Sequence, residues 1–172
     1  MYLKKIISLT LLSLFITSAK ALDSDTAKIN TLPKCIIKDI NGQPVNFAEY
    51  VGTGQLTIVS FWATWCKPCL AELIKIDNVY EEWQEKYKVR LIAVSVDDSR
   101  SAHKVKGLVA SKNWTYDVLI DLNSELRQAL NVTNPPTTFI IDKTGKIVYT
   151  HNGYLEGDEI ELESKLAELT GK

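Results

Sequence analysis

The sequence predicts an α/β domain in which helices flank a central sheet. Two segments, Leu56–Trp62 and residues 89–96, are apolar at nearly every position, as are strands buried on both faces of a parallel sheet. Between them, apolar residues in steps of three and four predict a helix over Lys67–Tyr87, with an inner face of Leu73, Ile76, Tyr80, Trp83 and Tyr87. A strand, a helix and a second buried strand form a βαβ unit, which is expected to be right-handed.

A small β-hairpin is expected before this unit, over residues 34–47. Its turn signal is Asn41-Gly42, and residues 45–47 are expected to form the return strand. The hairpin carries Cys35. This cysteine is interpreted as a small buried apolar residue, and the alternative is an exposed third thiol that pairs with a partner.

The second half of the chain predicts further strand–helix pairs. A short helix capped by Ser101 precedes a strand at residues 117–121, and a helix capped by Asn123 follows that strand. Thr137–Ile141 and residues 147–150 predict two antiparallel strands joined by a tight turn, so the sheet is expected to be mixed.

The last helix of the sequence begins with the pattern of a capping box. Asp158 and Glu161 have the required spacing, and the inner face of this helix is expected to consist of Leu162, Leu166 and Leu169. No internal domain boundary is evident, so residues 32–172 are expected to form one domain.

Residues 1–21 have the layout of a secretory signal peptide. A basic start is followed by a mostly apolar run at residues 6–16 and by a small-x-small site that ends at Ala21, where cleavage is expected. The run is shorter than the ~20 apolar residues that span a bilayer; the alternative is an uncleaved signal that associates with a membrane. Residues 22–31 are interpreted as a flexible leader. The expected location is the periplasm or another extracytoplasmic compartment, where disulfides persist.

Composition and charge narrow the range of functions. The chain has 172 residues, of which 45% are apolar, enough for a packed core, and its net charge is −1. Residues 1–21 contain three lysines and no acid, so the expected mature chain has a net charge of −4. This balance, without any basic cluster, argues against nucleic acid as a partner.

The chemistry of the chain is expected at Cys66 and Cys69, where the buried strand gives way to the helix. Thiol–disulfide exchange needs one thiolate to attack and a second thiol to resolve the mixed disulfide. The positive end of the helix favours a thiolate, Lys67 adds a positive charge, and Pro68 suits the first helical turn. We expect Cys66 to face outward and attack, and Cys69 to face inward and resolve.

The neighbours of the cysteine pair leave some alternatives open. Trp65 is expected either to shield one side of the pair and offer a flat apolar surface or to have a plain packing role. A Cys-x-x-Cys pair is also half of many zinc sites, but the chain has only two histidines, His103 and His151. Neither is near another Cys or His in the sequence, and both are interpreted as surface residues. No metal site and no cofactor are therefore expected.

Residues 62–69, Trp-Ala-Thr-Trp-Cys-Lys-Pro-Cys, resemble the active site of thioredoxin, and residues 136–142 resemble the cis-proline strand of that family. With the hairpin and the signal peptide, residues 32–170 are similar to the exported TlpA/ResA-type branch. The resemblance implies a thioredoxin-like three-layer fold: a central mixed sheet flanked by helices, with an N-terminal β-hairpin and a central strand–helix insertion.

The resemblance also implies roles for individual residues. Cys66 and Cys69 match the redox disulfide pair, and Pro136 matches the cis-proline. Glu72 matches a glutamate that ResA-like proteins keep; it either moves protons for Cys69 or is a solvated acid on the helix. Thioredoxin has a buried aspartate where this chain has Ser60.

The implied function is an exported thiol–disulfide oxidoreductase that reduces disulfides of partner proteins. A membrane thiol donor would recharge it, and a role in cytochrome c maturation is consistent with this branch. The alternative is a carrier of copper or another metal that uses the two thiolates. Peroxidase activity is disfavoured because Ala63 occupies the position of the peroxiredoxin threonine.

Overall fold

The computed structural model describes residues 32–52 and 54–172. The expected signal peptide and leader lie outside these residues. In the described part, a mixed sheet has the order β2-β1-β5-β4-β3-β6-β7. The strands are β1 (Ile36–Asp39), β2 (Pro44–Asn46), β3 (Leu56–Trp62), β4 (Val89–Ser95), β5 (Asp117–Ile120), β6 (Thr137–Ile141) and β7 (Ile147–Asn152). The helices are α1 (Phe47–Val51), α2 (Lys67–Tyr87), α3 (His103–Lys112), α4 (Glu125–Ala129) and α5 (Asp158–Thr170).

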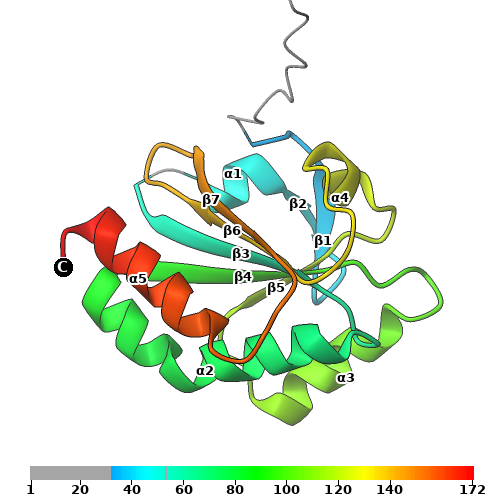
Figure 1. Cartoon of the computed structure of the whole chain (residues 1–172). Helices are drawn as coiled ribbons and strands as arrows, with labels where there is room; N and C mark the ends of the chain where they lie inside the picture. Colours follow the sequence, from blue (N-terminus) through cyan, green and yellow to red (C-terminus); the bar gives the residue numbers. More distant parts are fainter. Residues whose placement is uncertain (1–31, 53) are drawn as a thin grey trace, which may run out of the picture.

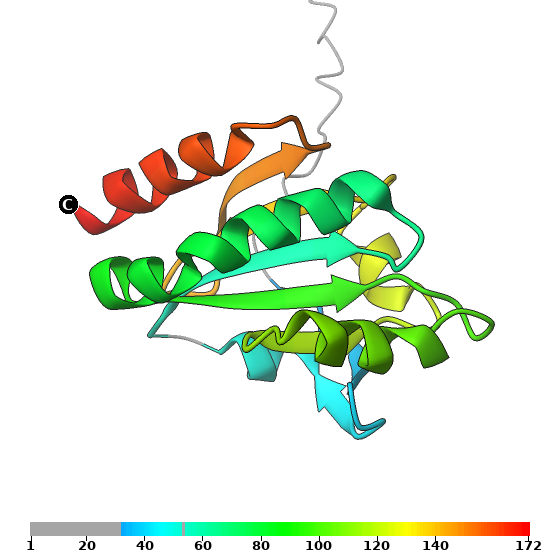
Figure 2. The same ribbon diagram turned by 90° about the horizontal axis from the view of Figure 1, so that it is seen from below.

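The sheet lies between two layers of helices, as expected. α2, α3 and α5 cover one face, and α1 and α4 cover the other (Figures 1 and 2). β3 is parallel to β4 and antiparallel to β6, and all seven of its residues are buried. The predicted βαβ unit and the mixed sheet are therefore confirmed, and the buried strand that leads to the cysteines is an interior strand of the sheet.

The N-terminal hairpin is present but shorter than predicted. β1 pairs with β2 and, on its other side, with β5, both in antiparallel fashion. Residues 45–47 were expected to be the return strand, but Phe47 instead begins α1 and is fully buried. The return strand is therefore confirmed as β2, but its predicted end was wrong by one residue, because burial of Phe47 in the core gives it a tertiary role that a three-residue pattern does not show.

Two helix starts also differ from the prediction. α3 begins at His103, because Ser101 belongs to a preceding turn in which its N–H and hydroxyl donate to the carboxylate of Asp98 at 3.2 and 3.0 Å. α4 has no side-chain cap from Asn123. The carboxylate of Asp121 instead accepts hydrogen bonds from backbone N–H groups in the first turn of α4, those of Leu126 and Arg127.

The capping box expected in α5 does not form. Asp158 is the first residue of the helix, and its carboxylate accepts a hydrogen bond from the N–H of Leu155 at 2.7 Å. On the inner face of α5, Leu162 and Leu166 are buried, whereas Leu169 is 41% exposed. The prediction was therefore right for two leucines and wrong for the third, because the last turn of α5 extends past the surface it covers.

α2 carries the predicted inner face. Its five apolar positions are all buried, and α5 packs against it.

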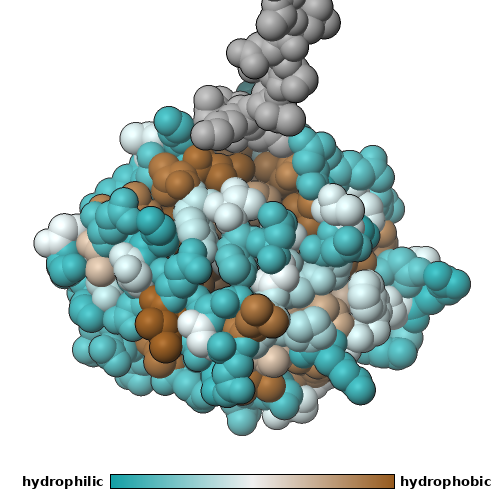
Figure 3. All heavy atoms as spheres, in the orientation of Figure 1, coloured by the Kyte–Doolittle hydropathy of each residue, from teal (hydrophilic) through white to brown (hydrophobic). Residues whose placement is uncertain are grey.

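Polar residues cover most of the surface in Figure 3, with scattered apolar patches between them. Within the described residues, no helix combines the length and apolar character needed to cross a bilayer.

Candidate redox site

A disulfide joins Cys66 and Cys69 at the point where β3 leads into α2. The sulfur atoms are 1.94 Å apart, and the Cα atoms are 5.3 Å apart. Cys66 is the N-cap residue of α2, with an extended backbone, and Lys67 and Pro68 are the first helical residues. Proline is tolerated there because the first helical N–H groups have no partner within the helix. One of these, the N–H of Cys69, donates to Cys66 Sγ at 3.3 Å.

The burial of the two cysteines corrects one expectation. Cys69 is fully buried, as predicted, but Cys66 is only 5% exposed instead of facing outward. The N-cap position explains this difference, because it folds the side chain of Cys66 back over the first turn of the helix. Trp65 is not packed in the interior, since 62% of it is exposed. It therefore offers a flat apolar surface immediately before the redox pair.

The peptide bond between Pro135 and Pro136 is cis, which confirms the expected geometry at Pro136. Pro136 immediately precedes β6, which runs antiparallel to β3, and Thr137 pairs with Phe61 near the end of β3. The register therefore places Pro136 at the end of the sheet from which the chain leads to the cysteines. The carbonyl of Pro136 accepts a hydrogen bond from the N–H of Gly153 at 2.8 Å.

Glu72 is a buried acid, so the interpretation as a solvated acid was wrong. It is 4% exposed, one helical step of three residues from Cys69. Its carboxylate accepts hydrogen bonds from the hydroxyls of Ser60 at 3.0 Å and Thr138 at 2.7 Å. Burial raises the pKa of Glu72 from 4.5 to about 7, although both hydroxyl bonds act to lower it. The carboxyl group can therefore gain or lose a proton near neutral pH.

Sequence reasoning did not identify the role of Thr138. Ser60 and Thr138 are directly opposite each other on β3 and β6, so their hydroxyls reach the same carboxylate. The position of Thr138 two residues after the cis-proline was a usable signal. Its partner on α2 is 66 residues away in the sequence, and no local pattern joins them.

Asp97 is a second residue that the sequence did not single out. It is fully buried and accepts hydrogen bonds from the N–H and hydroxyl of Thr64 at 2.8 and 2.6 Å, and from the hydroxyl of Ser95 at 2.8 Å. Thr64 lies two residues before Cys66. An acid directly after a buried parallel strand was the available signal, because neighbouring parallel strands end at the same edge. Asp97 thus ties the segment that carries the redox pair to the end of β4.

A small cavity lies beside Glu72 and is lined by residues of β7 and α5, among them Tyr149, His151 and Asp158. His151 is half-buried, not a surface residue, and lies 3.0 Å from the carboxylate of Asp158. His103 is exposed, as expected. Across residues 32–52 and 54–172, no group of three or more His, Cys, Asp or Glu side chains is arranged to hold a metal ion.

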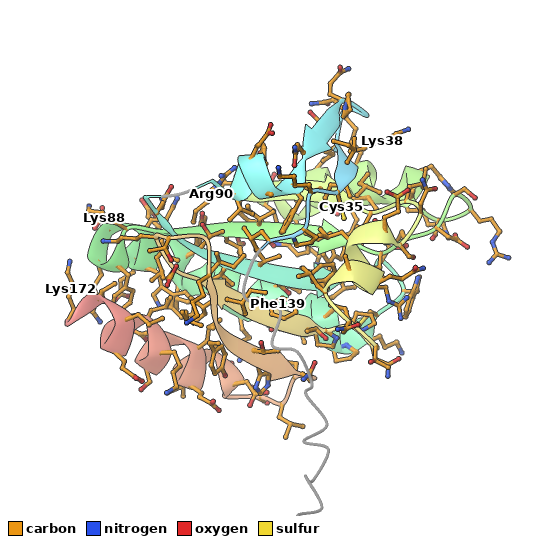
Figure 4. The ribbon with its side chains drawn as sticks, turned by 90° about the horizontal axis from the view of Figure 1, so that it is seen from above. Cys35, Lys38, Lys88, Arg90, Phe139 and Lys172 are labelled. Atoms are coloured by element: carbon orange, nitrogen blue, oxygen red, sulfur yellow. A yellow bond between two sulfur atoms is a disulfide. The ribbon has the colours of Figure 1, made fainter. Side chains whose placement is uncertain are left out.

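Cys35 is half-buried and carries a free thiol. It packs against the core at the N-terminal end of β1, near α4 (Figure 4). Burial raises the pKa of its thiol, and the negative charges of Asp121 and Glu125 act in the same direction. This environment disfavours a reactive thiolate. Cys35 therefore lies between the two alternatives, since it is neither fully buried nor activated for exchange.

Comparison with known proteins identifies the family of this chain. The family described as AhpC/TSA matches residues 29–150. The thiol-disulfide oxidoreductase ResA of Bacillus thuringiensis subsp. konkukian is 32% identical over 138 residues, which are 80% of this chain and 76% of the relative. ResA of Geobacillus kaustophilus is 30% identical over 132 residues, 77% of this chain and 73% of the relative.

A solved structure is also similar to this chain. A thioredoxin-like protein from Porphyromonas gingivalis has 47% identity and a TM-score of 0.74, covering 83% of this chain and 95% of that one. The chain therefore belongs to the thioredoxin-like AhpC/TSA family and is a thiol–disulfide oxidoreductase related to ResA.

Proposed function

We propose that this protein is an exported reductase of disulfides in partner proteins, with Cys66 as the attacking thiol and Cys69 as the resolving thiol. The observation that carries the proposal is the disulfide at the N-terminus of α2, in contact with an N–H of the first helical turn. Helix N-terminal N–H groups and the helix dipole stabilise a thiolate at this position. The exposed amine of Lys67 adds to this effect.

In the reduced protein, the thiolate of Cys66 attacks one sulfur of the partner's disulfide. The partner's S–S bond breaks, a mixed disulfide with Cys66 forms, and the partner's other sulfur leaves as a thiolate. Cys69 then loses its proton and attacks the sulfur of Cys66, which releases the partner's second thiolate. The partner gains two electrons, and the enzyme is left with the Cys66–Cys69 disulfide.

Glu72 is proposed to accept the proton of Cys69 in the second step. It lies three residues further along the same helix and is buried beside β3 and β6. A base works best when its pKa is close to the ambient pH, and the pKa of Glu72, about 7, meets that condition. Pro136 and Trp65 are proposed to border the surface on which the partner lies.

The proposal also includes the location of the protein and the source of its electrons. We infer that residues 1–21 direct export to the periplasm or another extracytoplasmic compartment and are removed after Ala21, leaving the leader at 22–31 and the domain at 32–172. A membrane thiol donor would reduce the Cys66–Cys69 disulfide after each cycle. A role in cytochrome c maturation, by reduction of apocytochrome c cysteines, is proposed from the resemblance of residues 32–170 to the TlpA/ResA-type branch.

The test uses serine variants and a protein disulfide substrate, with dithiothreitol as the reductant. Cys66→Ser is expected to abolish reduction, because it removes the attacking thiolate. Cys69→Ser, reduced beforehand and freed of dithiothreitol, is expected to accumulate a mixed disulfide with the substrate, visible on a non-reducing gel. Cys35→Ser is the matched control and is expected to keep full activity. Turnover by the Cys66→Ser protein would show that the roles are wrongly assigned, and bound copper without reductase activity would favour the metal carrier.

A further inference from the structure

A groove of about 530 Å³ lies beside the redox pair. Trp65 contributes one wall, from the segment between β3 and α2. Val96 and Arg100, from the segment between β4 and α3, contribute another, and Lys104 on α3 and Arg127 on α4 also line it. The two connecting segments and α4 lie at the same end of the sheet in both ribbon views (Figures 1 and 2). The groove is therefore assembled at the end of the molecule that carries the disulfide.

The charge of this groove is opposite to that of the whole chain. Its lining carries three cations, Arg100, Lys104 and Arg127, and a single acid, Asp98. The guanidinium of Arg100 already pairs with Asp98 through two hydrogen bonds, at 2.9 and 2.8 Å. The lining thus has a net charge of +2 on a protein whose overall charge is −1.

Within residues 32–52 and 54–172, the remaining two cations have no acid as a partner. Among the residues that the structure describes, Lys104 and Arg127 form no ion pair. Arg127 is held in place because its guanidinium donates to the backbone carbonyls of Val132 and Thr133, and neutral acceptors leave its charge uncompensated. A fixed arginine with spare charge is a preorganised site for a carboxylate.

The groove also offers apolar contact area. Trp65 is 62% exposed, and an exposed tryptophan ring next to a reactive centre is typical of surfaces that bind a protein partner. Cys66 directly follows Trp65, so a chain segment that lies on this ring lies next to the residue that carries the redox sulfur. The occupant that fits is an extended segment with an apolar side chain for Trp65 and acidic side chains for Lys104 and Arg127.

We propose that this groove selects partners in which aspartate or glutamate, together with an apolar residue, flanks the reactive disulfide. The proposal rests on the proposed function, because it names the class of partner that the reductase would reduce. Electrostatic selection of this kind acts mainly on the rate of association and weakens with salt.

The experiment compares two peptides of equal length that carry the same disulfide. One has aspartate, glutamate and leucine beside the disulfide, and the other has lysine and leucine. Lys104→Glu is expected to lower kcat/KM for the acidic peptide about tenfold and to raise it for the basic peptide, because it reverses one groove charge. The preference of the unmodified protein for the acidic peptide is expected to shrink when the salt concentration is raised.

Lys106→Glu is the matched control. Lys106 is exposed on the same helix, but its amine bonds to Asn41 and lies outside the groove lining. The Lys106→Glu variant has the same change of net charge as Lys104→Glu. Its kcat/KM for both peptides is expected to equal that of the unmodified protein. A small uncharged disulfide serves as a second control, because it reports the reactivity of Cys66 without using the groove.

The outcomes separate the two proposals. Equal kcat/KM for both peptides, or equal effects of Lys104→Glu and Lys106→Glu, would overturn the groove proposal while the small disulfide is still reduced. If the unmodified protein reduces neither the peptides nor the small disulfide, the proposed function itself fails. A loss with Lys104→Glu that is equally large for the small disulfide would assign Lys104 to the chemistry of Cys66 and not to partner selection.

Discussion

At the level of single residues, the sequence predicted local motifs but not burial that depends on distant segments. The sequence placed Glu72 on the helix behind Cys69 but left open whether it is solvated. Its burial depends on hydroxyls from two strands, Ser60 and Thr138, which are 12 and 66 residues away along the chain. The spacing within one helix is a local property, whereas burial is decided by which strands the helix covers. The cysteines and Pro136 were predictable because their motifs are local.

Replacing Glu72 with glutamine tests the buried carboxyl. Because burial raises its pKa from 4.5 to about 7, the folded state binds this proton more tightly than the unfolded state does. The associated stability is fully present below pH 4.5 and is lost as the pH rises through 7. The free energy of unfolding of the natural oxidised protein is therefore expected to fall between pH 5 and pH 8 by roughly 2–3 kcal/mol more than that of Glu72→Gln.

Urea unfolding at the two pH values measures this difference. Glu82→Gln is the control, since Glu82 is exposed on the same helix. It is expected to retain the pH dependence of the natural protein. Parallel pH profiles for the natural protein and Glu72→Gln would mean that the carboxyl of Glu72 titrates as an ordinary surface acid does.

At the scale of elements, periodicity predicted the long segments and failed for the short ones. α2 was predicted with its correct bounds because its apolar face repeats over 21 residues. α1 has five residues, too few to show a helical period, and it was missed. The first turn of α4 is bonded to the carboxylate of Asp121, which lies outside the helix, and Ser101 is held by Asp98 in a turn before α3, so a search for caps adjacent to each helix chose the wrong residues.

The inner face of α5 offers a matched pair of leucines. Leu166 is fully buried, whereas Leu169, less than one turn further along, is 41% exposed. Leu166→Ala is expected to lower the free energy of unfolding by about 2–5 kcal/mol, because it leaves a cavity beneath α5. Leu169→Ala is expected to cost less than about 1 kcal/mol, since its side chain is only partly removed from water. Chemical denaturation of both variants measures these changes in the free energy of unfolding. Equal losses would contradict the packing described for α5.

The whole molecule brings distant segments to one end of its sheet. β3 lies between β4 and β6, so the segment before Cys66, the buried Asp97 and the cis-proline share the same end. The α/β class and the mixed sheet followed from patterns along the chain. The pairing of β1 with β5 did not, because it joins residues about 80 positions apart and no local pattern specifies it.

A single sheet with one continuous core is expected to unfold cooperatively. Trp62, Trp83 and Trp114 are buried in different parts of that core, so tryptophan fluorescence reports on much of the domain. Fluorescence and far-ultraviolet circular dichroism are expected to give coincident urea transitions for the oxidised protein. Separate transitions would show that the hairpin edge or α5 unfolds independently of the central strands.

The position of β2 at the edge of the sheet affects whether another chain can add a strand there. In the described part of the chain this border strand has three residues, and the exposed Pro44 that starts it has no amide hydrogen to offer. A short edge strand that begins with proline is a poor template for pairing with a strand of another chain. Pairing of this kind at sheet edges is a common route to aggregation. The β2 edge is therefore a poor site for the recruitment of an unfolded chain.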